Sequence, residues 1–271
     1  MSNADRVVEV VAAIVALGRR ERMVLTAASL AYFAFISMVP LLLLLVVAVT
    51  ALGGDALAMS AVSRATTTLT PESADLLREI VFSAADRDRA TVIGVAVLFW
   101  GSLLTFRSLN TAFAGIYGTH GEPSMLSTLL DIVLVFVIIV ATVVALVLGG
   151  VGLSAFVQTR LWQTVGPLVV FVVLAMVFGP LYYVLPDVDV GFRETLPGTL
   201  FAAGAWTVLQ WLFGYYTQVS GLTRLYGAAS AFLLIMVWLY VGGFVLLVGA
   251  ALNAVLADRV DPDDGWIPGS E

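Results

Sequence analysis

The chain has 271 residues, of which 61% are hydrophobic and only 12% charged. Soluble domains have about 45–50% apolar and about 25% charged residues. This composition excludes a single water-soluble core of this length, and the mean hydropathy of +1.02 agrees. The formal net charge of −6 argues against a nucleic-acid partner, and the absence of cysteine excludes disulfides and thiolate metal sites.

All 13 basic residues are arginine. Acidic loops without lysine are typical of the surface of a salt-adapted protein, whose carboxylates hold water and cations. A high-GC genome that favours arginine codons explains the same composition, and both explanations stay open.

The first predicted element is an interfacial helix over residues 1–22. Its apolar residues recur at helical spacing (Val7, Val8, Val11, Ile14 and Val15), so the segment is expected to lie along the membrane surface. A signal peptide is the alternative. The segment ends in Arg19-Arg20-Glu21-Arg22 without a small-residue cleavage site, so we expect it to stay on the mature protein.

Six later stretches are each long and apolar enough to cross a bilayer, which takes roughly 20 residues in a helix. They are 24–52, 90–107, 128–157, 166–185, 197–219 and 228–256. The sequence therefore predicts an all-α, polytopic integral membrane protein, with a six-helix membrane domain over 23–257 and an acidic cytoplasmic tail over 258–271. Thr70-Pro71-Glu72 is a good helix start, so the outer loop 53–89 is expected to contain an amphipathic helix.

Arginine placement predicts the orientation. The cluster Arg19–Arg22 beside the first span decides it under the positive-inside rule. Both termini are then cytoplasmic, in a multi-pass protein of the cell membrane.

Four ordered sequence blocks carry a family resemblance. They are Ala27-Ala28-Ser29-Leu30-Ala31-Tyr32-Phe33 through Pro40, Phe106-Arg107-Ser108-Leu109-Asn110-Thr111-Ala112-Phe113, Leu196-Pro197-Gly198-Thr199-Leu200-Phe201, and Tyr226-Gly227 leading to Gly249-Ala250-Ala251-Leu252-Asn253-Ala254. Together they resemble the YihY/BrkB membrane proteins. The resemblance covers about residues 20–257.

The resemblance implies a six-helix inner-membrane protein without an established activity. Some members are tied to envelope integrity, serum resistance or lipopolysaccharide export. An old ribonuclease label on the family is widely thought mistaken. Members often carry a glutamate where this chain has Ala251, so any proton or ion pathway that uses this carboxylate is in doubt here.

The residue inventory supports neither catalysis nor cofactor binding. A metal-dependent nuclease needs clustered His, Asp and Glu, whereas this chain has one histidine, His120, and its acids are scattered in loops. Gly-x-Ser-x-Gly is absent. We therefore predict no catalytic residue, no metal site, no cofactor and no nucleic-acid partner.

Polar residues at membrane depth are the candidate functional residues, because burying them in lipid is costly. The predicted polar pathway consists of Arg107, Asn110, Asp131, Asn253, Gln210, Tyr32 and Ser37. Arg107 is expected to point into the bundle and pair with Asp131 or with polar groups of the first or last span. The structural alternatives are a snorkelling Arg107 and interhelical hydrogen bonds from Gln210 and Asn253.

Prolines inside predicted spans mark candidate hinges. They are Pro40 and the pair Gly179-Pro180. A proline frees the carbonyl four residues earlier, and the Ser37 hydroxyl is placed to take up part of the lost bonding at Pro40. Broken helices around a midplane site are one interpretation, and plain kinks are the other.

Two functions remain open at this stage. The protein is predicted to be a transporter or exporter of a lipid or anionic solute, with membrane lipids as its surroundings. The alternative is a non-transporting envelope-integrity or assembly protein in which the polar residues hold helices together. The substrate and the oligomeric state are not encoded in any motif that we recognise.

Overall fold

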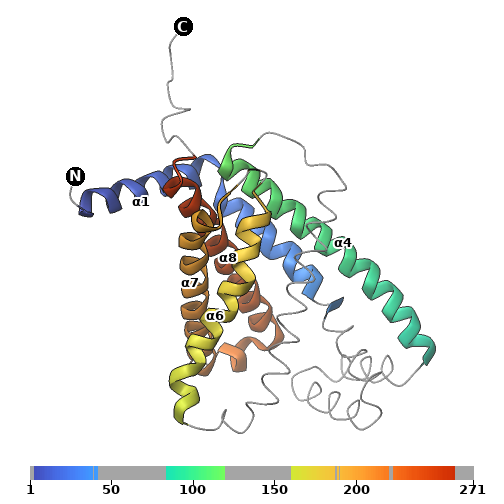
Figure 1. The fold of residues 1–271 in the computed structure, drawn as a ribbon. Coiled ribbons are helices and arrows are strands. Elements are labelled where there is room, and N and C mark those ends of the chain that lie inside the picture. Colours follow the sequence, from blue (N-terminus) through green and yellow to red (C-terminus); the bar gives the residue numbers. More distant parts are fainter. Residues whose placement is uncertain are drawn as a thin grey trace. The chain divides into compact units, whose positions relative to one another are not determined.

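The computed structural model describes residues 3–38, 40–41, 84–119, 160–186, 188, 190–219 and 222–259. All elements in these ranges are helices: α1 (Asn3–Arg20), an unlabelled helix over Met23–Met38, α4 (Ala84–Tyr117), α6 (Arg160–Val184), α7 (Phe192–Val219) and α8 (Leu222–Leu256) (Figure 1). The predicted all-α fold is confirmed. The span predicted over 128–157 and almost all of the loop 53–89 lie outside the described residues.

The chain divides into two compact units. The first joins Met1–Ala31 with Phe106–Glu271, and the second is Tyr32–Thr105. The second unit contains most of α4, and there the Ser37 side chain lies against Gly101. The first unit contains α1, the end of α4 and the packed helices α6, α7 and α8, and it holds the residues discussed below.

Three of the described helices are long and apolar enough to cross a membrane. They are Val92–Tyr117 within α4, Val165–Val184 within α6 and Phe232–Leu256 within α8. The described ranges thus establish several apolar helices of membrane length, and the count of six stays a prediction.

The helix α4 extends ten residues beyond the predicted end of the second span at Arg107. The buried face of the helix continues beyond Arg107. Leu109, Phe113, Ile116 and Tyr117 follow at helical spacing and are buried, while the Arg107 side chain is exposed. At the other end, α4 begins at Ala84, so the range predicted as outer loop includes its first turn.

The predicted N-terminal helix is confirmed as α1. Asp5 lies in its first turn and Arg19 and Arg20 in its last, which favours the helix through its dipole. Arg22 has a φ of 50°, and its carbonyl accepts the amides of Leu25 and Thr26. This left-handed residue therefore ends one helix and begins the next.

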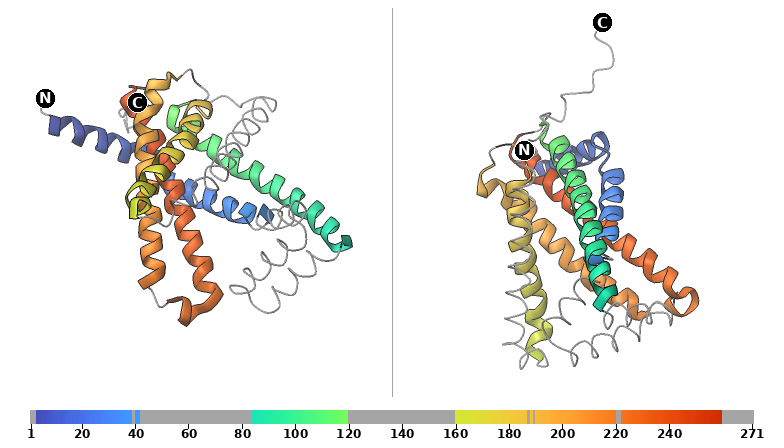
Figure 2. Two further views of the ribbon diagram at one scale, coloured as in Figure 1. Left: turned by 60° about the horizontal axis from the view of Figure 1, so that its bottom comes forward. Right: turned by 90° about the vertical axis from the view of Figure 1, so that its right-hand side faces the viewer.

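Small residues let α6, α7 and α8 pack closely, side by side (Figures 1 and 2). Ala202 and Ala203 of α7 and Ala250, Ala251 and Ala254 of α8 are completely buried. Membrane helices have no strong hydrophobic force between them, so close van der Waals contact through small residues supplies much of their association.

Two large side chains fit where α8 carries glycine. Trp206 lies against Gly242 and its indole N–H donates to the Gly242 carbonyl at 3.1 Å. Tyr182 of α6 reaches Gly249, and its hydroxyl donates to the Leu246 carbonyl at 2.8 Å. Aromatic polar tips thus satisfy buried backbone carbonyls on the neighbouring helix.

The tightest helix contact predicts a glycine requirement. A Cβ on Gly198 of α7 would collide with the Gly249 carbonyl and the Asn253 amide, whereas a Cβ on Gly214 of the same helix meets nothing within 4 Å. Overpacking costs typically 1–3 kcal/mol, so Gly198→Ala should lower the thermal unfolding temperature of the detergent-solubilised protein. Gly214→Ala is the matched control and should be neutral or slightly stabilising, because alanine favours helix by roughly 1 kcal/mol. Equal unfolding temperatures for the two variants would contradict this packing.

Candidate functional site

The candidate site lies where α7 begins beside the end of α8. Threonine hydroxyls bond the backbone of the first turns of α7: Thr195 Oγ1 donates to the Phe192 carbonyl at 2.9 Å, and Thr199 Oγ1 donates to the Thr195 carbonyl at 2.7 Å. Both threonines are buried. Such local bonds satisfy hydroxyls that would otherwise be costly inside an apolar core.

Asn253 of α8 joins this turn of α7 with both ends of its amide. Its Oδ1 accepts the Gly198 amide at 2.6 Å, and its Nδ2 donates to the Thr195 carbonyl at 3.2 Å. The side chain is 1% exposed. The absence of a side chain at Gly198 and Gly249 is what allows the two helices to come this close. Asn253 therefore fastens α8 to α7 and is closed to water in this arrangement.

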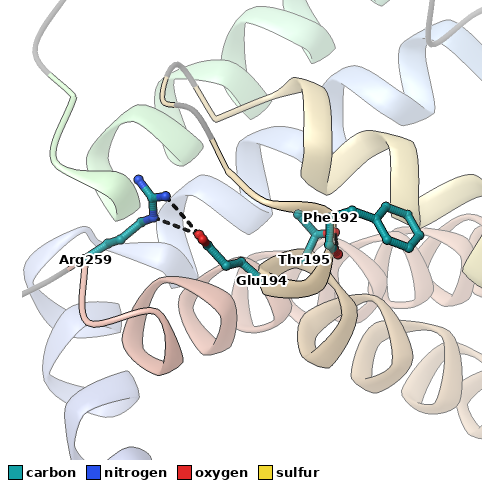
Figure 3. Close-up of polar contacts among 4 residues, drawn as sticks. All are labelled: Phe192, Glu194, Thr195 and Arg259. Atoms are coloured by element: carbon teal, nitrogen blue, oxygen red, sulfur yellow. Dashed lines mark hydrogen bonds and ion pairs between the residues drawn. The ribbon is translucent and has the colours of Figure 1, made fainter.

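An ion pair lies just beyond the end of α8 (Figure 3). Arg259 donates from Nε at 3.0 Å and from Nη2 at 2.9 Å to the same carboxylate oxygen of Glu194. Asp258, with a φ of 51°, turns the chain there, and the Arg259 amide donates to the Ala254 carbonyl at 3.0 Å. The helix end thus aims Arg259 at the first turn of α7. Both side chains are partly exposed, so this pair contributes little on its own.

Aromatic rings continue the same region toward α4 and α6. Phe113 stacks on Tyr117 at a centroid distance of 6.4 Å and meets Tyr182 at 5.8 Å. The Tyr117 hydroxyl is buried and has no hydrogen-bond partner among the described residues. Buried polar groups are almost always bonded, so the unpartnered Tyr117 hydroxyl is an exception among the described residues.

The described polar contacts of this region hold helices together. Among the described residues, no group of three or more His, Cys, Asp or Glu side chains could hold a metal ion. His120 lies outside the described residues. The charges that are present neutralise each other in the Glu194–Arg259 pair.

Among the described residues of the first unit, no hydrogen bond or ion pair joins the side chains of Arg107, Asn110, Gln210 and Asn253 to one another. Asn253 is buried and bonded, Asn110 is half-buried, and Arg107 and Gln210 are exposed. Asp131 lies outside the described residues, so its pairing with Arg107 stays a prediction.

Tyr32 and Ser37 belong to the second unit. Tyr32 is exposed and lies edge-on to Phe33 at 5.5 Å. The Ser37 hydroxyl donates to the Phe33 carbonyl at 2.9 Å, and this is a different carbonyl from that of Ile36, which Pro40 would free. Residue 39 lies outside the described residues, so the kink at Pro40 stays a prediction.

The second candidate hinge does not interrupt its helix. Helix α6 runs through Gly179 and Pro180 to Val184, and it also contains Pro167. Pro197 lies well inside α7, which begins five residues earlier. Helices α6 and α7 thus continue through their prolines, because neighbouring helices and hydroxyls can satisfy freed carbonyls.

Sequence reasoning did not single out Glu194, Arg259, Thr195 or Tyr117. Glu194 is an acid in the first turn of a helix, which is a common charge position, and Arg259 falls in the segment predicted as an acidic tail. Their pairing joins residues 65 apart in the chain. No spacing rule links residues so far apart.

The packed apolar helices, with polar groups used to fasten one helix to another, define a polytopic helical membrane protein. A comparison with family models matches residues 18–267 to Virulence factor BrkB. The chain therefore belongs to the Virulence factor BrkB family, as the sequence blocks predicted.

Individual relatives carry two kinds of name. The chain is 28% identical over 183 residues to a ribonuclease-like protein, YfkH, of Bacillus subtilis, covering 61% of this chain and 65% of that protein. It is 29% identical over 181 residues to a UPF0761 membrane protein of Aromatoleum aromaticum, covering 61% and 42%. It is 26% identical over 254 residues to a UPF0761 membrane protein of Pseudoalteromonas translucida, covering 88% and 82%. The chain thus spans less than two thirds of the first two relatives. No solved structure matches it.

The two hydrogen bonds of the Asn253 side chain to α7 predict a contribution to stability. Asn253→Leu keeps the side-chain size but removes both hydrogen bonds, so it should lower the free energy of unfolding by about 1–3 kcal/mol, the cost of leaving buried partners unpaired. Gln210→Leu is the control, because Gln210 is exposed on the same pair of helices, and it should change stability by less than roughly 0.5 kcal/mol. Thermal unfolding in detergent measures both. An Asn253→Leu protein as stable as the parent would show that the bonds do not fasten the helices.

Proposed function

We propose that this protein transports a lipid, or an anion with a lipid-like tail, across the cell membrane. The observation that supports it is the burial and bonding of Asn253, the most buried pathway candidate among the described residues. Its side chain is 1% exposed and both amide atoms are bonded within the protein. A polar solute needs a wet path through the helices, whereas a lipid can move along the boundary between protein and bilayer. The described helices therefore suit an apolar substrate at that boundary.

The same observation also supports a second candidate, a non-transporting protein of envelope integrity or assembly. In that case Asn253, Thr195 and Thr199 serve only to hold α7 and α8 together, and their bonds are the expected ones for such helices. A ribonuclease activity is not part of either candidate, because the described residues offer no metal-binding group.

Movement of substrates by the purified protein in liposomes separates these candidates. We expect a fluorescent anionic phospholipid to change leaflets faster than in protein-free liposomes, while a soluble organic anion stays enclosed. Arg107→Leu should abolish lipid movement if Arg107 binds the headgroup, and Arg107→Lys should retain part of it, because lysine keeps the charge but loses the planar fork.

Arg193→Leu is the control for this test, since Arg193 is also an exposed arginine but lies on α7. Movement of the soluble anion alone would reject a lipid substrate. Movement of neither probe, with an envelope defect in cells that lack the protein, would favour the non-transporting candidate.

We also propose that both termini face the cytoplasm, with the outer loop 53–89 on the other side. The cysteine-free chain allows single cysteines to be placed for labelling. Asp75→Cys should react with an impermeant thiol reagent in intact cells, and Asp258→Cys only after lysis. The reverse pattern would invert the orientation.

A further inference from the structure

An apolar groove lies between α1 and the packed helices. It has a volume of about 580 Å³, within the range of about 300–1,000 Å³ typical of small-molecule sites. One wall is α1 from Arg6 to Val15, which covers about 14 Å of helix. The other wall is made by Phe201 of α7 and by Val248, Leu252 and Leu256 of α8.

The groove is open toward the surroundings of the protein. The lining residues Val7, Val11 and Val15 are each about half-exposed or more. Phe201 and Leu256 also line the groove and are somewhat less exposed. Figures 1 and 2 show α1 projecting from the packed helices at the end where α8 finishes. An apolar groove under a helix that the sequence predicts to lie along the membrane surface would face the hydrocarbon of the bilayer.

One charged side chain lines this groove. Arg6 lies at the end farthest from the junction with the next helix, and no carboxylate among the described residues forms an ion pair with it. Asp5 and Glu9 are the nearest acids on α1 and both are exposed. At 100° per residue, Asp5 is turned about 140–180° and Glu9 about 100–140° away from Val10 and Ile14 around the helix axis. A cation at the mouth of an apolar groove matches an anionic headgroup on an acyl chain.

We infer that the groove between α1 and α7–α8 binds one acyl chain of an anionic phospholipid, with its phosphate on Arg6. Guanidinium and phosphate form paired, charge-assisted hydrogen bonds. The chain would cover apolar surface that α1 itself leaves open. This inference rests on the proposed function in naming the lipid class, but the binding site can stand without transport.

Lipid retention in native mass spectrometry tests the site. The detergent-solubilised protein is mixed with phosphatidylglycerol or phosphatidylcholine of matched chains. We expect one retained lipid, with phosphatidylglycerol preferred about fivefold, the factor for one arginine beside an anionic lipid. Arg6→Gln should bring the two lipids to near-equal retention.

Filling the groove tests the apolar part separately. Val10→Phe, and independently Ile14→Phe, should reduce retention of both lipids. Val8→Phe is the matched control, because Val8 is an exposed valine of α1 that does not line the groove. Arg19→Gln is the matched control for the charge. Each variant is first checked for an unchanged unfolding temperature, and the two filling variants guard against failure of either one to fold.

Three results would overturn the inference. The first is equal lipid retention in Val8→Phe and both groove-filling variants. The second is an unchanged preference for phosphatidylglycerol in Arg6→Gln, or an equal loss in Arg19→Gln. The third is a dimer, seen in the same spectra, that is lost in the Val10→Phe variant. Such a dimer would show that a second copy of the chain occupies the groove. Retention that follows the expected pattern, without lipid movement in liposomes, would keep the site and reject the proposed transport.

Discussion

The close contact between α7 and α8 is the constraint on which the first unit depends. Two glycines, Gly198 and Gly249, remove the side chains that would keep the backbones apart. Once the backbones are close, the amide of Asn253 reaches two backbone groups of α7. In a bilayer, water does not compete for such groups. The helix pair is therefore fixed in one register, and the aromatic residues of α6 pack against this fixed surface.

Residues at the helix ends set the direction in which the chain leaves each helix. Residues with positive φ end three helices, at Arg22, Gly118 and Asp258. At Arg22 the turn sends α1 away from the next helix and leaves an apolar groove beneath it. At Asp258 the turn places Arg259 on Glu194. A left-handed residue thus lies beside the apolar groove at one helix end and beside an ion pair at another.

Several residues of the blocks that carry the family resemblance are packing residues in the described part of the chain. Ala27 and Leu30 of the first block lie against Gly243, and Ser29 forms a hydrogen bond of 2.8 Å with Ser108 of the second block. Ala251, the position where the resemblance implies a glutamate in many members, is completely buried. A buried carboxylate would need a partner, whereas the alanine needs none.

The sequence by itself determined the class of the protein. Long apolar stretches leave only helices as membrane-spanning elements, and helical spacing identified α1. The same reasoning placed the end of the second span ten residues early, since a single exposed arginine interrupts composition without interrupting a helix.

Only the tertiary structure decided which polar residues meet. Asn253 was predicted either to line a pathway or to bond a neighbouring helix, and its partners lie 55 and 58 residues away. Glu194 and Arg259 are 65 apart. Periodicity reports which face of one helix is apolar, but it carries no information on which helix covers that face. The positions of these polar contacts follow from the backbone approach at Gly198 and Gly249, and that approach exists only after the helices have packed.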